Sequence, residues 1–235
     1  MKAVIVAAGE GSRLAPYTDI LPKIMFPVGG KPLGRRIIDT LCNSGYTDIL
    51  FCVSRQWSKY IQDYFGDGER FGARIAYSES DRTLGTAGEV KKAEGLIEDD
   101  FLVYYGDVLT QISLKEMELI HLKNVSEPKY MGVLGIQHGL DTEVGIIGIK
   151  SDGDVRVFQE KRQLPCYSWS AVAILKREVL NMITPEDNDF GSHIFPKIIK
   201  EGFNLKTYIN TNSWNDVGNL RSYKKVNNIY ENNKD

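Results

Sequence analysis

The feature that most constrains the fold is a regular alternation of two hydrophobic patterns along the first half of the chain. Continuous runs of β-branched and aromatic residues, typical of strands buried on both faces, occur at residues 2–9, 48–54, 73–80 and 100–109. Between these runs, apolar residues recur at helical spacing in residues 31–45, 56–68 and 88–97. The alternation predicts an α/β fold with a doubly wound, mostly parallel, Rossmann-like sheet that carries helices on both faces.

The second half of the chain has a less regular pattern. Short runs typical of strands, some of them suited to antiparallel pairing, occur at residues 129–137, 145–150, 154–161, 169–176 and 204–211. A loop and a helix are expected at residues 185–202, and a turn followed by a C-terminal helix at residues 213–233. No linker, repeat or shift in composition separates the two halves. We therefore predict one domain, in which a mixed or antiparallel substrate-binding lobe follows the doubly wound core.

Composition excludes several classes of protein. With 42% hydrophobic and 26% charged residues, the chain is globular and not disordered. A formal net charge of -2 gives no bulk basic surface for a nucleic acid. The apolar run at residues 3–8 is far too short to span a membrane, and it lacks a signal-peptide pattern. The three cysteines have no metal-ligand spacing and are expected to be free thiols. We expect a cytoplasmic protein without nucleic-acid or membrane partners.

A glycine-containing turn follows the first predicted strand. Gly9 and Gly11 let the backbone approach a ligand closely, and the exposed amides of such a turn can hold phosphate oxygens. Two common phosphate-binding motifs do not fit. The dinucleotide motif needs a third glycine where this chain has Leu14, and no Walker A string occurs. An ordinary strand-to-helix turn is the competing interpretation of the glycines alone.

Two cations follow the glycines on a connection that cannot be helical throughout. Pro16 and Pro22 restrict helix formation in residues 15–32, while the apolar residues of this segment predict that it packs against the protein. Arg13 offers a planar set of donors that suits phosphate, and Lys23 adds a second positive charge. A packed connection that fixes two cations is suited to a polyphosphate ligand.

The same segment resembles the signature of a known enzyme family. Residues 7–33, AAGEGSRLAPYTDILPKIMFPVGGKPL, are similar to the pattern GxGxRLxPxTxxxPKxMxPVxxKPL of the sugar-1-phosphate nucleotidyltransferases, or nucleotide-sugar pyrophosphorylases. Four later segments extend the resemblance: LGTAGEV at 84–90, YYGDVL at 104–109, FQEK at 158–161 and WNDVGN at 214–219. The likeness is strongest to the mannose-1-phosphate guanylyltransferases and implies a fold of the nucleotide-diphospho-sugar transferase type.

The resemblance also implies how the chain is organised. One nucleotidyltransferase domain spans residues 1–235, with a nucleotide-binding half at 1–112 and a sugar-binding half with the C-terminal helix at 113–235. The chain has none of the hexapeptide repeats that form a C-terminal β-helix in some relatives, so no such domain is expected. A homo-oligomer is compatible with the family, and the sequence leaves the oligomeric state open.

The family's chemistry needs no covalent enzyme intermediate. The resemblance implies that a sugar 1-phosphate attacks the α-phosphorus of a nucleoside triphosphate in line, so that pyrophosphate leaves and a nucleotide-sugar forms. The protein must therefore position two anions and neutralise their charge. Mg²⁺ is the implied cofactor, with Asp107 and Asp216 as its ligands. Without the resemblance, an aspartate beside a glycine is more often a turn or cap residue.

The resemblance assigns the nucleotide to residues of the first half. Arg13 would contact the triphosphate and Lys23 the α-phosphate region, and both are the implied catalytic residues. The residues expected at the base, the ribose and the adjoining loop are small ones: Ala8, Gly9, Gly11, Gly85 and Gly88.

The sugar phosphate is assigned to three residues of the second half: Gly145 beside the sugar, Glu160 on its hydroxyl groups and Lys161 on its phosphate. A solvated pair of charges on a strand edge is the competing interpretation of Glu160 and Lys161. Two departures from the family pattern bear on this end of the site. The lysine motif reads EKR where many relatives have EKP, and Ser170–Ala171 stand where many have an Asn-Ala-Gly turn. The departures leave open whether residues 170–171 contact the sugar.

The GTAG sequence at 85–88 resembles the guanylyltransferases for mannose and heptose more than the thymidylyltransferases for glucose. Mannose 1-phosphate with GTP is therefore the first expectation, and glucose 1-phosphate with dTTP or UTP is the second. Two further alternatives are a transferase of the same fold that uses a non-sugar phosphate, such as phosphocholine, and a non-catalytic nucleotide-sugar sensor. The FQEK and WNDVG motifs favour the sugar class. The joint presence of Arg13, Lys23, Asp107 and Asp216 argues against a sensor.

Overall fold

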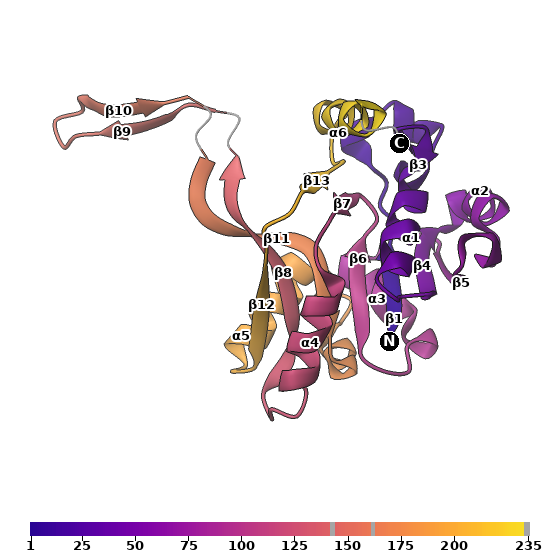
Figure 1. Ribbon diagram of the computed structural model, residues 1–235. Helices are drawn as coiled ribbons and strands as arrows, with labels where there is room; N and C mark the ends of the chain where they lie inside the picture. The colour runs from indigo at the N-terminus through magenta and orange to yellow at the C-terminus, as the bar shows by residue number, and fades with distance from the viewer. Residues whose placement is uncertain (142–143, 161–162, 233–235) are drawn as a thin grey trace.

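The computed structural model describes residues 1–141, 144–160 and 163–232. Its centre is a seven-stranded sheet with the order β12-β8-β11-β6-β1-β4-β5 (Figure 1). In chain order these strands are β1 (Lys2–Val6), β4 (Asp48–Ser54), β5 (Arg74–Ser80), β6 (Phe101–Tyr105), β8 (Tyr130–Asp141), β11 (Gln163–Leu175) and β12 (Asn204–Asn210). Strand β11 runs antiparallel to its neighbours β6 and β8, whereas the other neighbouring pairs in this sheet are parallel. The predicted mostly parallel α/β fold is confirmed.

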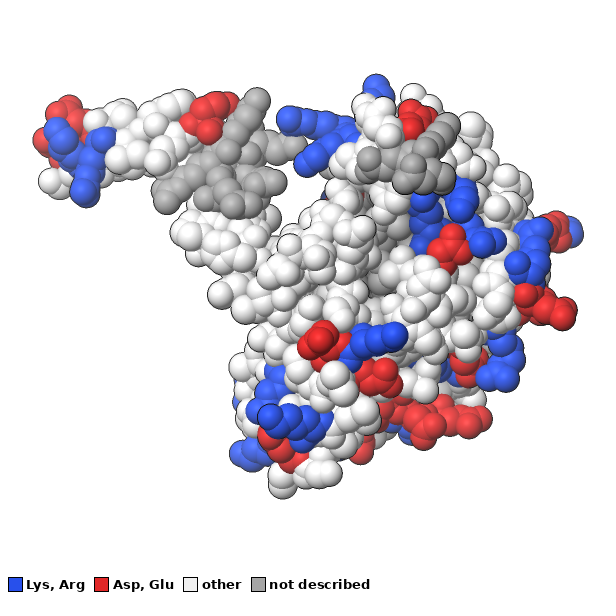
Figure 2. All heavy atoms as spheres, viewed as in Figure 1, with Lys and Arg blue, Asp and Glu red and all other residues white. Residues whose placement is uncertain are grey.

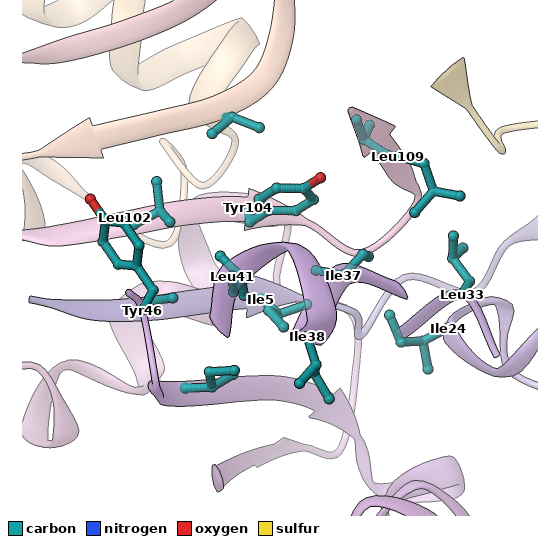
Figure 3. Close-up of a cluster of buried hydrophobic side chains, with 14 of the residues drawn as sticks. Ile5, Ile24, Leu33, Ile37, Ile38, Leu41, Tyr46, Leu102, Tyr104 and Leu109 are labelled. Atoms are coloured by element: carbon teal, nitrogen blue, oxygen red, sulfur yellow. The ribbon is translucent and has the colours of Figure 1, made fainter. Parts of the chain in front are cut away.

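Helices cover both faces of the sheet because successive residues of its buried strands point to opposite sides. Ala3 and Ile5 of β1 belong to one hydrophobic core, and Val4 belongs to the other. The first core is covered by α1 (Leu33–Asn43), α2 (Arg55–Phe65), α4 (Leu114–Asn124) and α6 (Leu220–Asn232). Figure 3 shows Ile37 and Leu41 of α1 above Ile5 in this core. The second core is covered by α3 (Thr86–Lys92), α5 (Phe195–Lys200), the 3-10 segment Arg177–Met182 and the π-helical segment Phe190–Ile194.

Two elements differ from the sequence-based expectation. The strand expected at residues 100–109 is divided at Gly106–Asp107 into β6 and the short strand β7 (Val108–Thr110), which pairs with β13 (Trp214–Asp216). A side chain at position 106 would lie 2.9 Å from the backbone oxygen of Val6, so the glycine permits the close approach at this break. No element is predicted from the sequence at residues 114–124, where the structure has α4. The hydroxyl of Ser113 accepts a hydrogen bond from the Glu116 amide and caps this helix.

The connection that carries the two cations is packed, as predicted. It contains three 3-10 turns, Ser12–Leu14, Tyr17–Asp19 and Lys23–Met25, followed by the short strands β2 (Pro27–Val28) and β3 (Lys31–Pro32). Five of its apolar side chains are buried: Leu14, Ile24, Met25, Phe26 and Val28. Burial of these side chains fixes the path of the backbone on either side of Lys23.

Helix α6 closes over this connection from the far end of the sequence. The amide of Gly29 donates to Asn227 Oδ1 at 2.9 Å, and the hydroxyl of Tyr223 donates to the carbonyl of Pro27 at 2.8 Å. The guanidinium of Arg36 lies 4.1 Å from the centre of the Tyr230 ring and donates to the Val28 carbonyl. The helix that follows β13 therefore holds the segment that carries Lys23.

A two-stranded ribbon projects from the sheet beyond the ends of β8 and β11 (Figure 1). It is formed by β9 (Ile146–Ile149) and β10 (Val155–Gln159), which pair antiparallel and confirm the strands expected in this region. Ile147, Ile149 and Phe158 are each more than half exposed. Figure 2 shows charged side chains of both signs gathered at the tip of the ribbon. Within the described ranges, no helix is both long and apolar enough to cross a membrane.

Candidate active site

A cavity of ≈ 380 Å³ opens at the carboxyl ends of the parallel strands, where an open α/β sheet binds its ligands. Its wall includes the ends of β1 and β6, the turn after β1 and the start of α3. Many of the residues singled out from the sequence line it: Ala8, Gly9, Arg13, Lys23, Gly85, Asp107 and Asp216. Residues more than two hundred positions apart in the chain therefore share one cavity.

Lys23 and Asp107 form an ion pair in this cavity. Lys23 Nζ donates to Asp107 Oδ2 at 2.9 Å, and the two side chains are 15% and 25% exposed. Lys23 opens a 3-10 turn directly after Pro22, and Asp107 occupies the break between β6 and β7. Partial burial strengthens the attraction between the two charges relative to an exposed pair.

Asp216 is positioned in the same cavity by the antiparallel pairing of β13 with β7. It lies opposite Val108, and the amide of Val217 donates to the carbonyl of Asp107 at 2.8 Å. Burial and the neighbouring charge of Asp107 raise the pKa of Asp216, while Lys23 and Arg13 offset part of that rise. A side chain at Gly218 would come within 2.6 Å of Asp216 Oδ2, so the Asp216 carboxylate would have to shift to make room for it.

The donor set of Asp107 and Asp216 fits Mg²⁺. This ion takes oxygen ligands and is commonly held by one or two carboxylates, with waters and substrate phosphates completing its shell. Among the residues that the structure describes, no group of three or more histidine, cysteine or acidic side chains is placed to hold a metal. The pair thus suits an ion that arrives with a phosphate ligand better than a metal held by protein alone.

The loop at residues 83–88 is fixed by the segment that precedes the π-helical turn. The amides of Ala87 and Gly88 donate to the carbonyl of Asn188 at 2.9 and 3.0 Å, and the Thr86 hydroxyl donates to Asp189 Oδ2 at 2.8 Å. Gly85 has a φ of 78°, and a side chain there would lie 2.5 Å from the Asn188 carbonyl. Gly88 lines a neighbouring cavity of ≈ 650 Å³ and not the first one.

Gly11 lies in the turn after β1 but outside the cavity wall. Its φ is 67°, and an added side chain would meet Thr18 Cγ2 at 2.7 Å. The hydroxyl of Thr18 donates to the carbonyl of Gly11 at 3.1 Å. Gly11 therefore shapes the turn that presents Arg13, and its predicted contact with the nucleotide stays a prediction.

Two of the three residues predicted for the sugar phosphate, Gly145 and Glu160, are described, and neither lines the cavity wall. Gly145 and Glu160 face each other at the base of the β9–β10 ribbon, where a side chain on Gly145 would lie 3.0 Å from Glu160 Oε2. Glu160 is exposed. Lys161 lies outside the described residues. Among the described residues, more of the predicted nucleotide end than of the predicted sugar end therefore lies at the cavity.

Several cavity residues were not predicted from the sequence. Ala171 lines the cavity with a φ of 60°, at an irregularity in the pairing of β11 with β8. The sequence departs from the family's Asn-Ala-Gly turn at this position. A glycine adopts such a positive φ without strain, so the departure was a sign that the backbone here is unusual. Trp214 also lines the wall, and its indole nitrogen donates to the carbonyl of Ser170 at 2.9 Å. Thr86 and Glu89, within the GTAGE sequence, are further wall residues.

Comparisons with known proteins show which proteins this chain is similar to. A UTP–glucose-1-phosphate uridylyltransferase of Synechocystis sp. is 30% identical over 240 residues, covering 95% of this chain and 61% of the relative. A mannose-1-phosphate guanyltransferase of Saccharomyces cerevisiae is 28% identical over 240 residues, covering 95% and 63%. The crystal structure of HddC from Yersinia pseudotuberculosis in complex with GMP-PN has a TM-score of 0.72 and 23% identity, covering 97% and 99%.

This chain spans about three-fifths of the length of the two curated relatives named above. Residues 2–233 match the family model described as nucleotidyl transferase. The expected resemblance is confirmed, and the chain belongs to the nucleotidyl transferase family.

Proposed function

We propose that this protein transfers a nucleotidyl group from a nucleoside triphosphate to a sugar 1-phosphate, forming a nucleotide-sugar and releasing pyrophosphate. The observation that carries the proposal is the meeting of Arg13, Lys23, Asp107 and Asp216 in one cavity. Two cations and a carboxylate pair suited to a divalent ion match what is needed to hold a triphosphate and a second phosphate together.

In this mechanism the protein orients the substrates and neutralises their charge. Arg13 binds the triphosphate, and Lys23 exchanges its contact with Asp107 for one with the α-phosphate region. Asp107 and Asp216 hold Mg²⁺, which, when bound, balances the negative charge on the phosphates. Ala8 and Gly9 leave room for the base and the ribose, since neither carries a large side chain. Bond formation and loss of pyrophosphate then need no nucleophile from the protein.

In this proposal, the two halves of the chain bind different substrates. Residues 1–112 supply the nucleotide end, with Gly85 close to the base. Residues 113–235 supply Asp216 and the sugar end, where Gly145, Glu160 and Lys161 bind the sugar and its phosphate. The proposed setting is the cytoplasm, with nucleoside triphosphate and sugar 1-phosphate as the partners.

The preferred substrates in this proposal are GTP and mannose 1-phosphate, on the basis of the GTAG sequence. The alternative is glucose 1-phosphate with UTP or dTTP. It is supported by the name of the uridylyltransferase relative from Synechocystis sp..

The test is a matrix of pyrophosphate-release assays with Mg²⁺. GTP, dTTP, UTP, CTP and ATP are each combined with mannose, glucose, N-acetylglucosamine and heptose 1-phosphates. We expect release with one preferred pair and none without the sugar phosphate. If no combination releases pyrophosphate while calorimetry shows nucleotide binding, the proposal is wrong. The protein would then be a transferase that uses a non-sugar acceptor, or a nucleotide sensor.

A further inference from the structure

The wall of the cavity contains a buried carboxylate to which the proposed mechanism assigns no role. Glu89 lies in α3 and is 3% exposed, and it is the only acidic residue in the described part of the chain that is buried. Burial of a charged group is costly unless the group is paired or hydrogen-bonded. A carboxylate retained in such a place therefore has a structural role, a ligand-binding role or both.

The two oxygens of Glu89 have different surroundings. Oε1 accepts hydrogen bonds from the Ser80 hydroxyl at 3.0 Å and from the Leu84 amide at 3.1 Å. No described residue donates to Oε2, and Glu89 forms no ion pair within the described ranges. Burial raises the pKa of Glu89, while these two hydrogen bonds and the charge of Lys92 offset part of that rise. One oxygen thus holds the loop, and the other is left for a donor from outside the protein.

Glu89 lies on the opposite side of β1 from the carboxylate pair. In the sheet order β6-β1-β4-β5, Asp107 follows β6, whereas Glu89 packs against β4 and β5 through its contacts with Cys52 and Ser80. Arg13 lies on the loop that leaves β1. A nucleotide whose phosphates lie at Arg13 and Lys23 would therefore extend its base toward α3 and the loop before it, where the lining residues of the same cavity are Thr83, Gly85, Thr86 and Glu89.

We propose that Glu89 Oε2 binds the Watson–Crick edge of the base and selects guanine, an inference that rests on the proposed function. An ionised carboxylate only accepts hydrogen bonds. Guanine presents two adjacent donors, N1–H and N2–H₂, on this edge. Uracil and thymine present one imide N–H between two carbonyl oxygens, which a carboxylate repels, while adenine and cytosine each place one amino group beside a ring acceptor.

The sharpest probe of this contact is ITP, which differs from GTP only by lacking the N2 amino group. We expect GTP to exceed ITP by about tenfold or more in kcat/KM, the effect of losing one hydrogen bond to a charged group. UTP and dTTP should be used still more weakly, because a buried polar group left unpaired discriminates strongly. Calorimetric affinities of the same nucleotides for the full chain give a readout that does not depend on turnover.

Glu89→Gln separates the two oxygens of this side chain. The amide oxygen can still accept from Ser80 and Leu84, while the amide nitrogen replaces Oε2 and turns an acceptor into a donor. We expect the GTP-to-ITP ratio to fall to about one and the relative use of UTP to rise. As a matched control, Ser80→Ala removes a bond to Oε1 without changing Oε2, and it should leave the GTP-to-ITP ratio as it is in the unmodified protein.

The outcomes distinguish this inference from the proposed function. A preference of the unmodified protein for UTP or dTTP, or an unchanged GTP-to-ITP ratio in a folded Glu89→Gln variant, overturns the role of Glu89 while nucleotidyl transfer stands. Absence of turnover with every nucleotide overturns the proposed function. The calorimetric GTP-to-ITP ratio then still decides whether Glu89 binds guanine.

Discussion

The cavity and the β9–β10 ribbon present their predicted ligand-binding residues in opposite ways. Around the cavity, Lys23 pairs with Asp107, and loop 83–88 is bound to the Asn188 carbonyl. On the ribbon, Glu160 stands exposed, with its carboxylate close to Gly145. The nucleotide end is therefore fixed by contacts that also stabilise the protein, whereas the described residues of the sugar end, Gly145 and Glu160, show no such hydrogen bond or ion pair. Substitutions at the two ends should differ in their effect on stability as well as on activity.

The largest effect is expected from Asp107→Asn at the fixed end. Loss of one carboxylate charge weakens metal binding and leaves Lys23 without its ionic partner, so turnover should fall by roughly 100-fold or more. The measurement is the rate of pyrophosphate release as Mg²⁺ is varied, with the exposed Asp63→Asn as the control. Unchanged turnover at limiting Mg²⁺ would remove Asp107 from the mechanism.

A smaller and cleaner effect is expected on the ribbon. Glu160→Gln should raise the KM for sugar 1-phosphate by about tenfold, the loss of a charge-assisted hydrogen bond, and leave the KM for nucleotide and the melting temperature unchanged. Asp154→Asn, on the same ribbon and also exposed, is the matched control. A parallel loss of affinity for nucleotide would show that the two ends are not separate.

Thr86→Val tests whether the fixed end combines stability with binding. The change removes the hydrogen bond from Thr86 to Asp189 Oδ2 and the acceptor of the Phe190 amide, at a cost of about 1–2 kcal/mol in the free energy of unfolding. We expect this loss in urea unfolding, together with a several-fold higher KM for nucleotide. Thr86→Ser keeps the hydroxyl and should restore both quantities. A change in only the free energy of unfolding, or only the KM for nucleotide, would show that stability and nucleotide binding are not linked at Thr86.

The smallest effect on activity is expected far from both ends, at Asp100. Burial acts to raise the pKa of Asp100, but hydrogen bonds from His121 and the Arg177 amide outweigh it and lower the pKa below the ordinary value. A lowered pKa in the folded state stabilises the protein above the ordinary carboxyl range, and this stabilisation is lost as the pH falls through the lowered value.

Urea unfolding between pH 7 and 3 checks this expectation. The unmodified protein should lose stability toward pH 3, and Asp100→Asn should show a shallower loss while keeping its activity at pH 7. Parallel pH profiles for the two proteins would show that Asp100 makes no such contribution.

The elements of the first half could be predicted because their patterns are local. The run at residues 48–54, for example, coincides with β4. Helix α4 was missed because its pattern is ambiguous: Leu119 and Leu122 are exposed, while His121 is buried against Tyr130 and Asp100. A polar residue on the buried face obscures the apolar spacing on which such predictions depend.

Prediction of the site depended on information of a different kind. No spacing argument places Asp216 beside Asp107, since that contact depends on the pairing of β13 with β7. The resemblance to a family indicated it. The direction of the ribbon, the positive φ of Ala171 and the free oxygen of Glu89 come from tertiary packing and could not be predicted from local sequence.

The contacts between α6 and the segment that carries Lys23 have a consequence for the synthesis of the protein. Ribosomes synthesise a chain from its N-terminus, so residues 1–112 emerge first and carry Arg13, Lys23 and Asp107. Asp216, and the helix that contacts Pro27 and Gly29, emerge later. A nascent chain at that stage lacks one of the two cavity carboxylates. The proposed site can be completed only after the ribosome has added β13 and α6, so a product that stops at residue 112 should not transfer a nucleotidyl group.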